Sequence, residues 1–147
     1  MDGVYLNDYK PALMHLLKSI FKGDFQDYAP LFIRLPIGFH LIYGTQDNVF
    51  SWSRMLEFRE FLDVNGFPVP LLCALVSVYA QFICGALYIL GYRVRPAACV
   101  MIFNFIVALV MVHSGDSYPV MFPAIMMLFG SLYLLLNGPG RFSLSSS

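Results

Sequence analysis

The sequence is poor in charged residues. Only 12% of its 147 residues are charged and 59% are hydrophobic, whereas an average globular protein has about 25% charged residues. Between positions 64 and 140 the charged residues are Arg93, Arg95 and Asp116, which leaves uncharged runs at 64–92, 96–115 and 117–140. Each run reaches the roughly 20 residues with which a helix crosses a hydrocarbon layer of about 30 Å. A water-soluble fold of this length cannot bury so many apolar residues, so lipid must solvate much of the surface.

Several kinds of functional site are also missing from the sequence. Cys73, Cys84 and Cys99 all fall in apolar runs and none belongs to a C-x-x-C pair, so we interpret them as packing residues and not as redox thiols. The three histidines stand at different predicted heights, which argues against a shared metal ion or a haem held by two histidines. No basic run suits a nucleic acid.

The pattern of runs predicts an all-α fold: an integral membrane four-helix bundle with two short interfacial amphipathic helices. We place the first span in the run that contains Arg34 and His40. The domain covers residues 28–144, with spans at about 28–49, 69–90, 96–113 and 118–136. Connections of about five residues after the second and third spans require antiparallel neighbours.

Residues 1–27 form an N-terminal segment that we expect to lie on the membrane surface. Asp2 and Asp8 argue against a secretory signal, so the first span should remain in the mature protein. Residues Leu13, Leu16, Leu17 and Ile20 follow a helical spacing. This stretch is too short to span a bilayer, and it fits either an interfacial helix or the groove of a soluble partner.

Residues 50–66 predict the second interfacial helix. Ser51 or Ser53 can cap its start, and the pair Asn65-Gly66 can end it in a left-handed turn. Its apolar side would consist of Met55, Leu56 and Leu62. The only tryptophan, Trp52, suits the headgroup region.

The distribution of charge predicts the orientation in the membrane. The side with the termini and the 91–95 turn carries Lys10, Lys18, Lys22, Arg93, Arg95 and Arg141. The opposite side has only Arg54 and Arg59, together with five acidic residues. By the positive-inside rule, we expect a multi-pass membrane protein with both termini in the cytoplasm.

Polar residues within the spans are the candidate binding site. Arg34 can snorkel towards the near surface, or it can share an inner-leaflet pocket with His40, Gln81 and Asn104. Tyr43 and Tyr79 would flank this pocket. The pocket would suit a lipid headgroup, a quinone ring or an anion, but the same groups could equally form interhelical hydrogen bonds.

A second polar cluster is expected at the outer face, where His113 and Asp116 follow the third span. We interpret it as an interfacial loop in preference to a binding site. No serine–histidine–acid or phosphate-loop pattern is present, and no metal site is predicted.

The order of motifs resembles the DoxX family of small four-span bacterial membrane proteins. The stretches that carry the resemblance are Arg34–Phe39, Gly66–Pro70, Gln81–Gly85, Gly91, Arg93–Ala98, His113 and Asn137–Ser143. It covers about residues 29–144. Two positions depart from the family pattern: Gln81 stands where a glutamate is usual, and the tail ends Leu144–Ser147 where an aspartate is usual.

The resemblance implies a multi-pass protein of the bacterial cytoplasmic (inner) membrane that is associated with redox complexes. Our leading hypothesis is an anchoring or organising subunit of a membrane complex, in contact with membrane lipid and with a protein partner or a second copy. The alternative is a quinone-linked oxidoreductase subunit acting on a small sulfur compound, in which Arg34 binds the anion and His40 exchanges protons. Quinone is the one cofactor that either hypothesis invokes. A small-solute transporter is least favoured, because no broken helix or intramembrane carboxylate appears.

Overall fold

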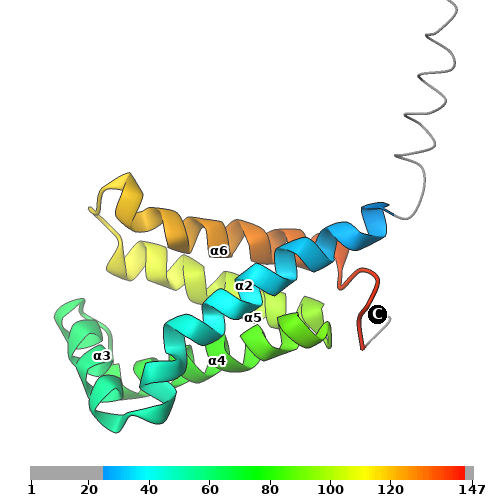
Figure 1. Cartoon of the computed structure of the whole chain (residues 1–147). Helices are drawn as coiled ribbons and strands as arrows, with labels where there is room; N and C mark the ends of the chain where they lie inside the picture. Colours follow the sequence, from blue (N-terminus) through cyan, green and yellow to red (C-terminus); the bar gives the residue numbers. More distant parts are fainter. Residues whose placement is uncertain (1–24, 145–147) are drawn as a thin grey trace, which may run out of the picture.

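The computed structural model describes residues 25–144, and this part of the chain is built from helices (Figure 1). In chain order they are α2 (Phe25–Phe50), α3 (Trp52–Val64), α4 (Pro70–Leu90), α5 (Val94–Val107), the π-helical turn η1 (Ala108–Val112) that continues α5, and α6 (Tyr118–Asn137). No strand occurs among the described residues. The predicted all-α fold is confirmed, whereas the predicted helix within residues 1–27 lies outside the described residues, apart from the start of α2.

Three of the described helices are long and apolar enough to cross a membrane. They are α4, α5 together with η1, and α6. These helices match the second, third and fourth predicted spans to within about two residues at each end. Helix α2 is longer than any of them but is less apolar, with Arg34 and His40 in its middle, and it is not among these candidates. Length and composition therefore identify a membrane protein with three candidate spans in its described part.

Helix α2 packs mainly against α4, and two glycines make this crossing close (Figure 1). A Cβ atom on Gly38 would lie 2.7 Å from the carbonyl oxygen of Gly85, and a Cβ on Gly85 would lie 2.8 Å from that of Gly38. Small residues are what allow helix backbones to approach in membrane proteins. The pair Gly38–Gly85 therefore fixes where α2 crosses α4.

The other long helices pack beside this pair. Helix α5 packs mainly against α6, to which it is joined by the short 113–117 connection. Between α4 and α6 the buried hydroxyl of Tyr88 donates a hydrogen bond of 3.1 Å to the Ser131 hydroxyl. The surrounding core contains Ile37, Leu41, Cys84, Val94, Ala97, Ala98, Met101, Phe105, Ala124 and Leu134. The core thus draws residues from all four long helices.

Helix α3 folds back onto α4. Its buried residues Met55 and Leu62 pack with Ala74 and Val78 in a second, smaller core. The left-handed Gly66, at φ +76°, follows the helix end as predicted. The apolar side of α3 therefore packs on α4 of the same chain, whereas we expected this side to lie on the membrane surface.

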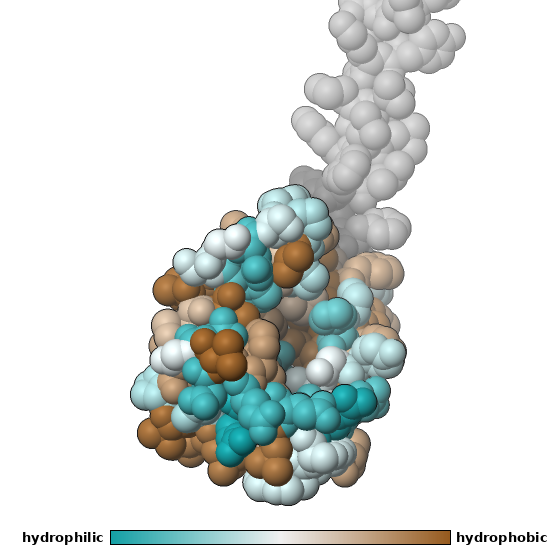
Figure 2. Space-filling model, turned by 90° about the vertical axis from the view of Figure 1, so that its left-hand side faces the viewer, coloured by the Kyte–Doolittle hydropathy of each residue, from teal (hydrophilic) through white to brown (hydrophobic). Residues whose placement is uncertain are grey.

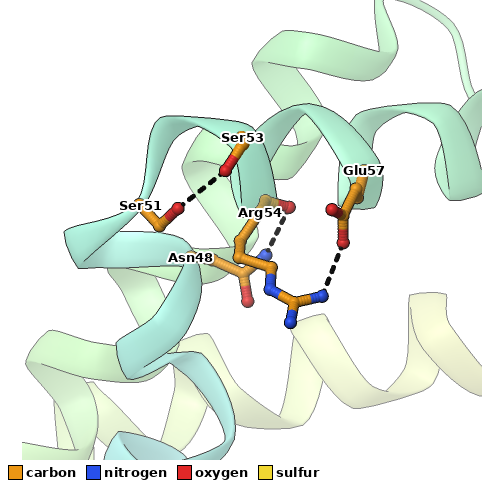
Figure 3. Close-up of polar contacts among 5 residues, drawn as sticks. All are labelled: Asn48, Ser51, Ser53, Arg54 and Glu57. Atoms are coloured by element: carbon orange, nitrogen blue, oxygen red, sulfur yellow. Dashed lines mark hydrogen bonds and ion pairs between the residues drawn. The ribbon is translucent and has the colours of Figure 1, made fainter.

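Polar contacts hold the turn between α2 and α3 (Figure 3). The Asn48 amide donates to the carbonyl oxygen of Arg54 at 3.0 Å, and the Arg54 guanidinium pairs with Glu57 at 2.8 Å. Ser51 and Ser53 share a hydrogen bond of 2.9 Å. All these groups are exposed, and exposed ion pairs contribute little to stability. Their effect is to set the direction in which α3 leaves α2.

The two ends of the bundle differ. One end holds the start of α2, the 91–93 turn and the C-terminal segment 138–144 (Figure 1). The opposite end holds α3 and the 113–117 connection. We call these the tail end and the α3 end. Arg93, Arg95 and Arg141 are all at the tail end, as the charge pattern predicted for one side of the membrane.

Candidate functional site

A cavity of about 410 Å³ lies among α3, α4, α5 and η1. It reaches from the middle of α4 and α5 towards the α3 end of the bundle. Apolar and aromatic side chains form most of its wall: Phe58, Phe61, Leu62, Phe67, Val76, Ala80, Val100, Phe103, Phe105, Val107, Ala108 and Val112. Its volume and apolar lining are those of pockets that hold small organic molecules.

Three polar side chains from two helices form a hydrogen-bonded chain in this wall. The Gln81 amide nitrogen donates to the Ser77 hydroxyl at 3.1 Å, and that hydroxyl donates to the amide oxygen of Asn104 at 2.8 Å. Gln81 and Ser77 are four residues apart on α4 and therefore lie on one face, whereas Asn104 comes from α5. All three residues line the cavity.

This arrangement leaves hydrogen-bonding capacity for a ligand. The Asn104 oxygen and the Ser77 hydroxyl are engaged, so the two N–H groups of the Asn104 amide and the oxygen of the Gln81 amide remain. A ligand carbonyl can accept from Asn104, and a ligand hydroxyl can donate to Gln81. Both groups are neutral, so the site favours an uncharged polar head attached to an apolar body.

The cavity is open on the outer surface of α4 and α5. Val76 and Phe103 line it, yet 61% and 72% of these residues are exposed. Val100, which is also exposed, lies one helical turn before Phe103. Because α4 and α5 are candidate membrane spans, this opening faces the region where acyl chains would lie. An apolar molecule can therefore enter sideways from a bilayer.

An ionisable pair stands at the α3 end of the cavity. His113 lines the cavity, and its Nδ1 atom lies 2.9 Å from a carboxylate oxygen of Asp116. Such a carboxylate fixes the orientation of an imidazole ring. Figure 2 looks onto the α3 end, where hydrophilic residues border a hollow in the surface. The only other titratable cavity residue is Cys73, whose thiol donates to the Pro68 carbonyl at 3.1 Å.

The π-helical turn η1 forms the wall next to His113. Ala108 and Val112, the first and last residues of this turn, both line the cavity. Short π-helical turns within α-helices are frequent at functional sites. Here the wider turn carries the chain from α5 to His113 along the cavity edge.

Arg34 occupies a separate site at the tail end. Only 1% of this residue is exposed, and its guanidinium donates to the main-chain carbonyl of Phe142 in the C-terminal segment. Its remaining nitrogens, Nε and Nη1, are buried without a hydrogen-bond partner. Gly91 lies directly against the guanidinium, because a Cβ atom there would be 2.7 Å from the Arg34 Cζ atom.

The structure brings together only part of the site expected from the sequence. Gln81 and Asn104 meet through Ser77, whereas Arg34 lies under the tail and does not line the cavity. His40 is exposed on α2 and is also outside the cavity. Tyr43 and Tyr79 are exposed and do not line the cavity either. The single inner-leaflet pocket that we expected is thus replaced by a cavity towards the α3 end and a separate buried arginine at the tail end.

Two contributors were missed by reasoning from the sequence. Ser77 links the two amides, and its spacing of four residues from Gln81 was the available signal. The aromatic wall from Phe58 and Phe61 was missed because α3 was expected to lie on the membrane surface. His113 was assigned to a loop, and the structure also makes it a cavity residue. Among residues 25–144, no three histidine, cysteine or acidic side chains cluster in a way that could hold a metal ion.

Comparison with known proteins identifies the family. The family model described as DoxX matches residues 29–114. The matched region contains α2, α3, α4, α5 and η1, apart from the first turn of α2, and so includes every residue that lines the cavity. No curated protein and no solved structure gives a significant match. The match covers more than half of the chain and agrees with the three apolar helices, so this protein belongs to the DoxX family of membrane proteins.

Proposed function

We propose that the protein is an anchoring or organising subunit of a membrane complex, and that its cavity holds one neutral amphipathic molecule, a lipid or a quinone. The observation that carries this proposal is the Gln81–Ser77–Asn104 chain in an otherwise apolar wall. Its free amide groups match a carbonyl or hydroxyl head, and the lateral opening admits an apolar tail. Within the described lining, only His113 and Cys73 are titratable, which favours binding over catalysis.

We further propose that α2 also crosses the membrane, as the first of four spans, and that the tail end faces the cytoplasm. Helix α2 has 26 residues, or about 39 Å at 1.5 Å per residue, and it packs along α4. Arg34 is buried at the tail end of α2, so its charge would not contact acyl chains. The arginines of the tail end support a cytoplasmic location by the positive-inside rule. The cavity would then open towards the outer leaflet of the inner membrane.

A subunit role also needs a surface for a partner, and α2 offers one. Phe32, Phe39 and Tyr43 are all exposed on α2, and the rings of Phe39 and Tyr43 stack at 5.9 Å. His40 adds a polar group to this outward side, where acyl chains alone would leave an imidazole without a hydrogen bond. A photo-crosslinking residue at position 39 should capture a membrane protein, whereas the same residue at Val120 on α6 should not.

The ligand is tested by thermal unfolding in mild detergent with a short-tailed quinone and, separately, with a neutral diacylglycerol. Binding to the folded state alone stabilises a protein by about 2.7 kcal/mol at a ligand concentration of 100 Kd. We expect one of the two molecules to raise the Tm of the wild type and to lose this effect in Asn104→Leu. Asn137→Leu is the matched control, because Asn137 is an exposed amide bonded to the Tyr133 carbonyl. If neither molecule raises the Tm, the proposed ligand class is wrong.

A second candidate function is a quinone-linked oxidoreductase subunit, and the His113–Asp116 pair is the observation that favours it. A quinone takes up protons when it is reduced, and an imidazole held by a carboxylate at the cavity edge can supply them. Arg34 and His40, the residues first considered for this reaction, both lie outside the cavity. Quinone reduction by a small sulfur donor that is lost in His113→Gln, with quinone still bound, would favour this candidate.

A further inference from the structure

The C-terminal segment covers the tail end of the bundle. The main-chain N–H of Arg141 donates to the carbonyl of Asp27 at 2.9 Å, and the N–H of Leu144 donates to the carbonyl of Leu90 at 3.4 Å. Residues 138–144 therefore run from α6 across the start of α2 to the end of α4, as the red tail in Figure 1 shows. We call this segment the strap.

Arg34 lies beneath the strap. Gly91 lies close to both, since a Cβ atom on it would be 2.7 Å from the Arg34 Cζ atom and 2.9 Å from the Cα of Ser143 in the strap. The carbonyl of Phe142 is the hydrogen-bond acceptor that the strap supplies. The strap thus closes a site whose floor is a buried cation.

The charge of Arg34 is poorly matched in this closed state. A guanidinium has five N–H donors and stays protonated in proteins. Here Nε and Nη1 have no hydrogen-bond partner. The ion pairs among the described residues are Arg54–Glu57, Arg59–Glu60 and His113–Asp116, and none of them involves Arg34. A buried cation without a counter-ion is unfavourable, and an oxyanion that accepts two hydrogen bonds is its best complement.

The strap holds the Phe142 carbonyl in place with strained backbone. Phe142 has φ +57°, in the left-handed region that a bulky residue rarely adopts. Its side chain is 72% exposed and contacts only the edge of the bundle, where its ring lies 5.6 Å from that of Tyr28. Gly138 and Gly140, which precede it, also have positive φ and can act as pivots. Release of the strap would relieve the strain at Phe142.

The surroundings of Arg34 attract anions. Arg93 and Arg141 lie over the rings of Tyr92 and Tyr28, at 5.7 and 5.9 Å, and Arg95 lies beside Gly138. Asp27 is the only acidic residue of the described chain at this end. Three more guanidiniums therefore stand around the strap, at the level where the headgroups of a bilayer would lie.

We propose that Arg34 is a phosphate-binding site gated by the strap. A phosphate oxygen takes the place of the Phe142 carbonyl, a second oxygen reaches the unpaired nitrogens, and residues 141–144 move away. The phosphate belongs either to an anionic lipid or to free inorganic phosphate. This site is separate from the cavity and does not depend on the proposed function.

The test uses the full-length protein in mild detergent. Phosphatidylglycerol, phosphatidylcholine and inorganic phosphate are titrated separately, with native mass spectrometry for the lipids and thermal shift for all three. Hydrogen exchange is followed in peptides that contain Arg141 and Leu144. We expect phosphatidylglycerol or inorganic phosphate to bind and to speed exchange in the strap, and the response to one or the other identifies the source. Arg34→Gln should weaken binding at least about tenfold, while Arg54→Gln, at the α3 end, should not change it.

A second variant keeps the test decisive if Arg34→Gln does not fold. Phe142→Gly removes the strain of the left-handed backbone and so stabilises the closed strap without adding a charge, and it should bind the phosphate several-fold more weakly than the wild-type chain. The proposal would be overturned if neither phosphatidylglycerol nor inorganic phosphate bound. It would also be overturned if a folded Arg34→Gln protein bound them as well as the wild type does. Binding that leaves strap exchange unchanged would exclude the gate and so overturn it as well.

Discussion

Arg34 and Phe142, 108 positions apart in the sequence, meet through a hydrogen bond from the guanidinium to the main-chain carbonyl. This contact ties the C-terminal segment to α2 across the tail end of the bundle. It also requires a glycine at position 91, where the guanidinium occupies the space that a Cβ would need.

Gly91→Ala should therefore destabilise the protein strongly. Gly66 provides a matched control, since its φ of +76° is similar to the +67° of Gly91 but no atom lies within 4 Å of its Cβ position. Left-handed backbone costs alanine about 1–2 kcal/mol at either site. The collision with Arg34 should add about 1–3 kcal/mol at position 91 only. Thermal unfolding in detergent measures the difference, and equal Tm values for the two variants would mean that Arg34 does not pack on Gly91.

The crossing of α2 and α4 gives a second prediction. Gly38→Ala places a methyl group 2.7 Å from the Gly85 carbonyl and should destabilise the bundle by about 1–3 kcal/mol. Gly44→Ala is the control on the same helix, where nothing lies within 4 Å. That change should be neutral or stabilising by up to about 1 kcal/mol, because alanine favours helix. A Gly38→Ala protein as stable as Gly44→Ala would contradict the close crossing.

Val69, at the start of α4, is expected to be a stabilising target. It has φ +49°, which is unfavourable for a β-branched residue and for the residue before a proline. Val69→Gly should raise the free energy of unfolding by about 1 kcal/mol, after the entropy cost of glycine is subtracted. Val64→Gly, at the end of α3, should instead lower it. The ligand response should be measured as well, since the neighbouring Phe67 and Cys73 line the cavity.

The proposed topology predicts opposite labelling of the two ends. In a background with Cys73, Cys84 and Cys99 replaced by alanine, Ser114→Cys and Tyr92→Cys each introduce one exposed thiol. A membrane-impermeant maleimide should label Ser114→Cys in intact spheroplasts and Tyr92→Cys only after lysis. Labelling of both positions in intact spheroplasts would mean that the chain does not cross the membrane between residues 92 and 114. Labelling of Tyr92→Cys alone would mean that the tail end faces outwards.

The fold was largely predictable from the sequence because few residues interrupt the apolar runs. Arg93, Arg95 and Asp116 mark ends of runs, and the helices observed there begin and end close to those positions. Gln81 and Asn104 were expected to meet because each lies near the middle of one of two adjacent antiparallel helices. Ser77 joins the two amides, and it could have been predicted as well because it lies four residues before Gln81 on the same helix face.

The position of Arg34 was not predictable in the same way. Its partner is a main-chain carbonyl in a loop, and a carbonyl leaves no signature in the sequence. The residue that receives it, Phe142, gives no hint of left-handed backbone either. The packing of α3 on α4 could not be predicted, because the sequence pattern of an apolar helical face is the same whether it faces lipid or protein. The direction of His40 depends on how α2 is rotated about its axis, which is set by its packing on α4, including the Gly38–Gly85 crossing.

Native mass spectrometry of the protein purified without added ligand tests the central claim most directly. We expect the wild type and Asn137→Leu to carry one co-purified neutral molecule of lipid or quinone mass per chain. Gln81→Leu and Asn104→Leu should lose it while remaining folded, because the head would find no hydrogen-bond partner in the cavity. A wild type without such a molecule, or equal retention in all four proteins, would contradict the assignment of the cavity as the binding site.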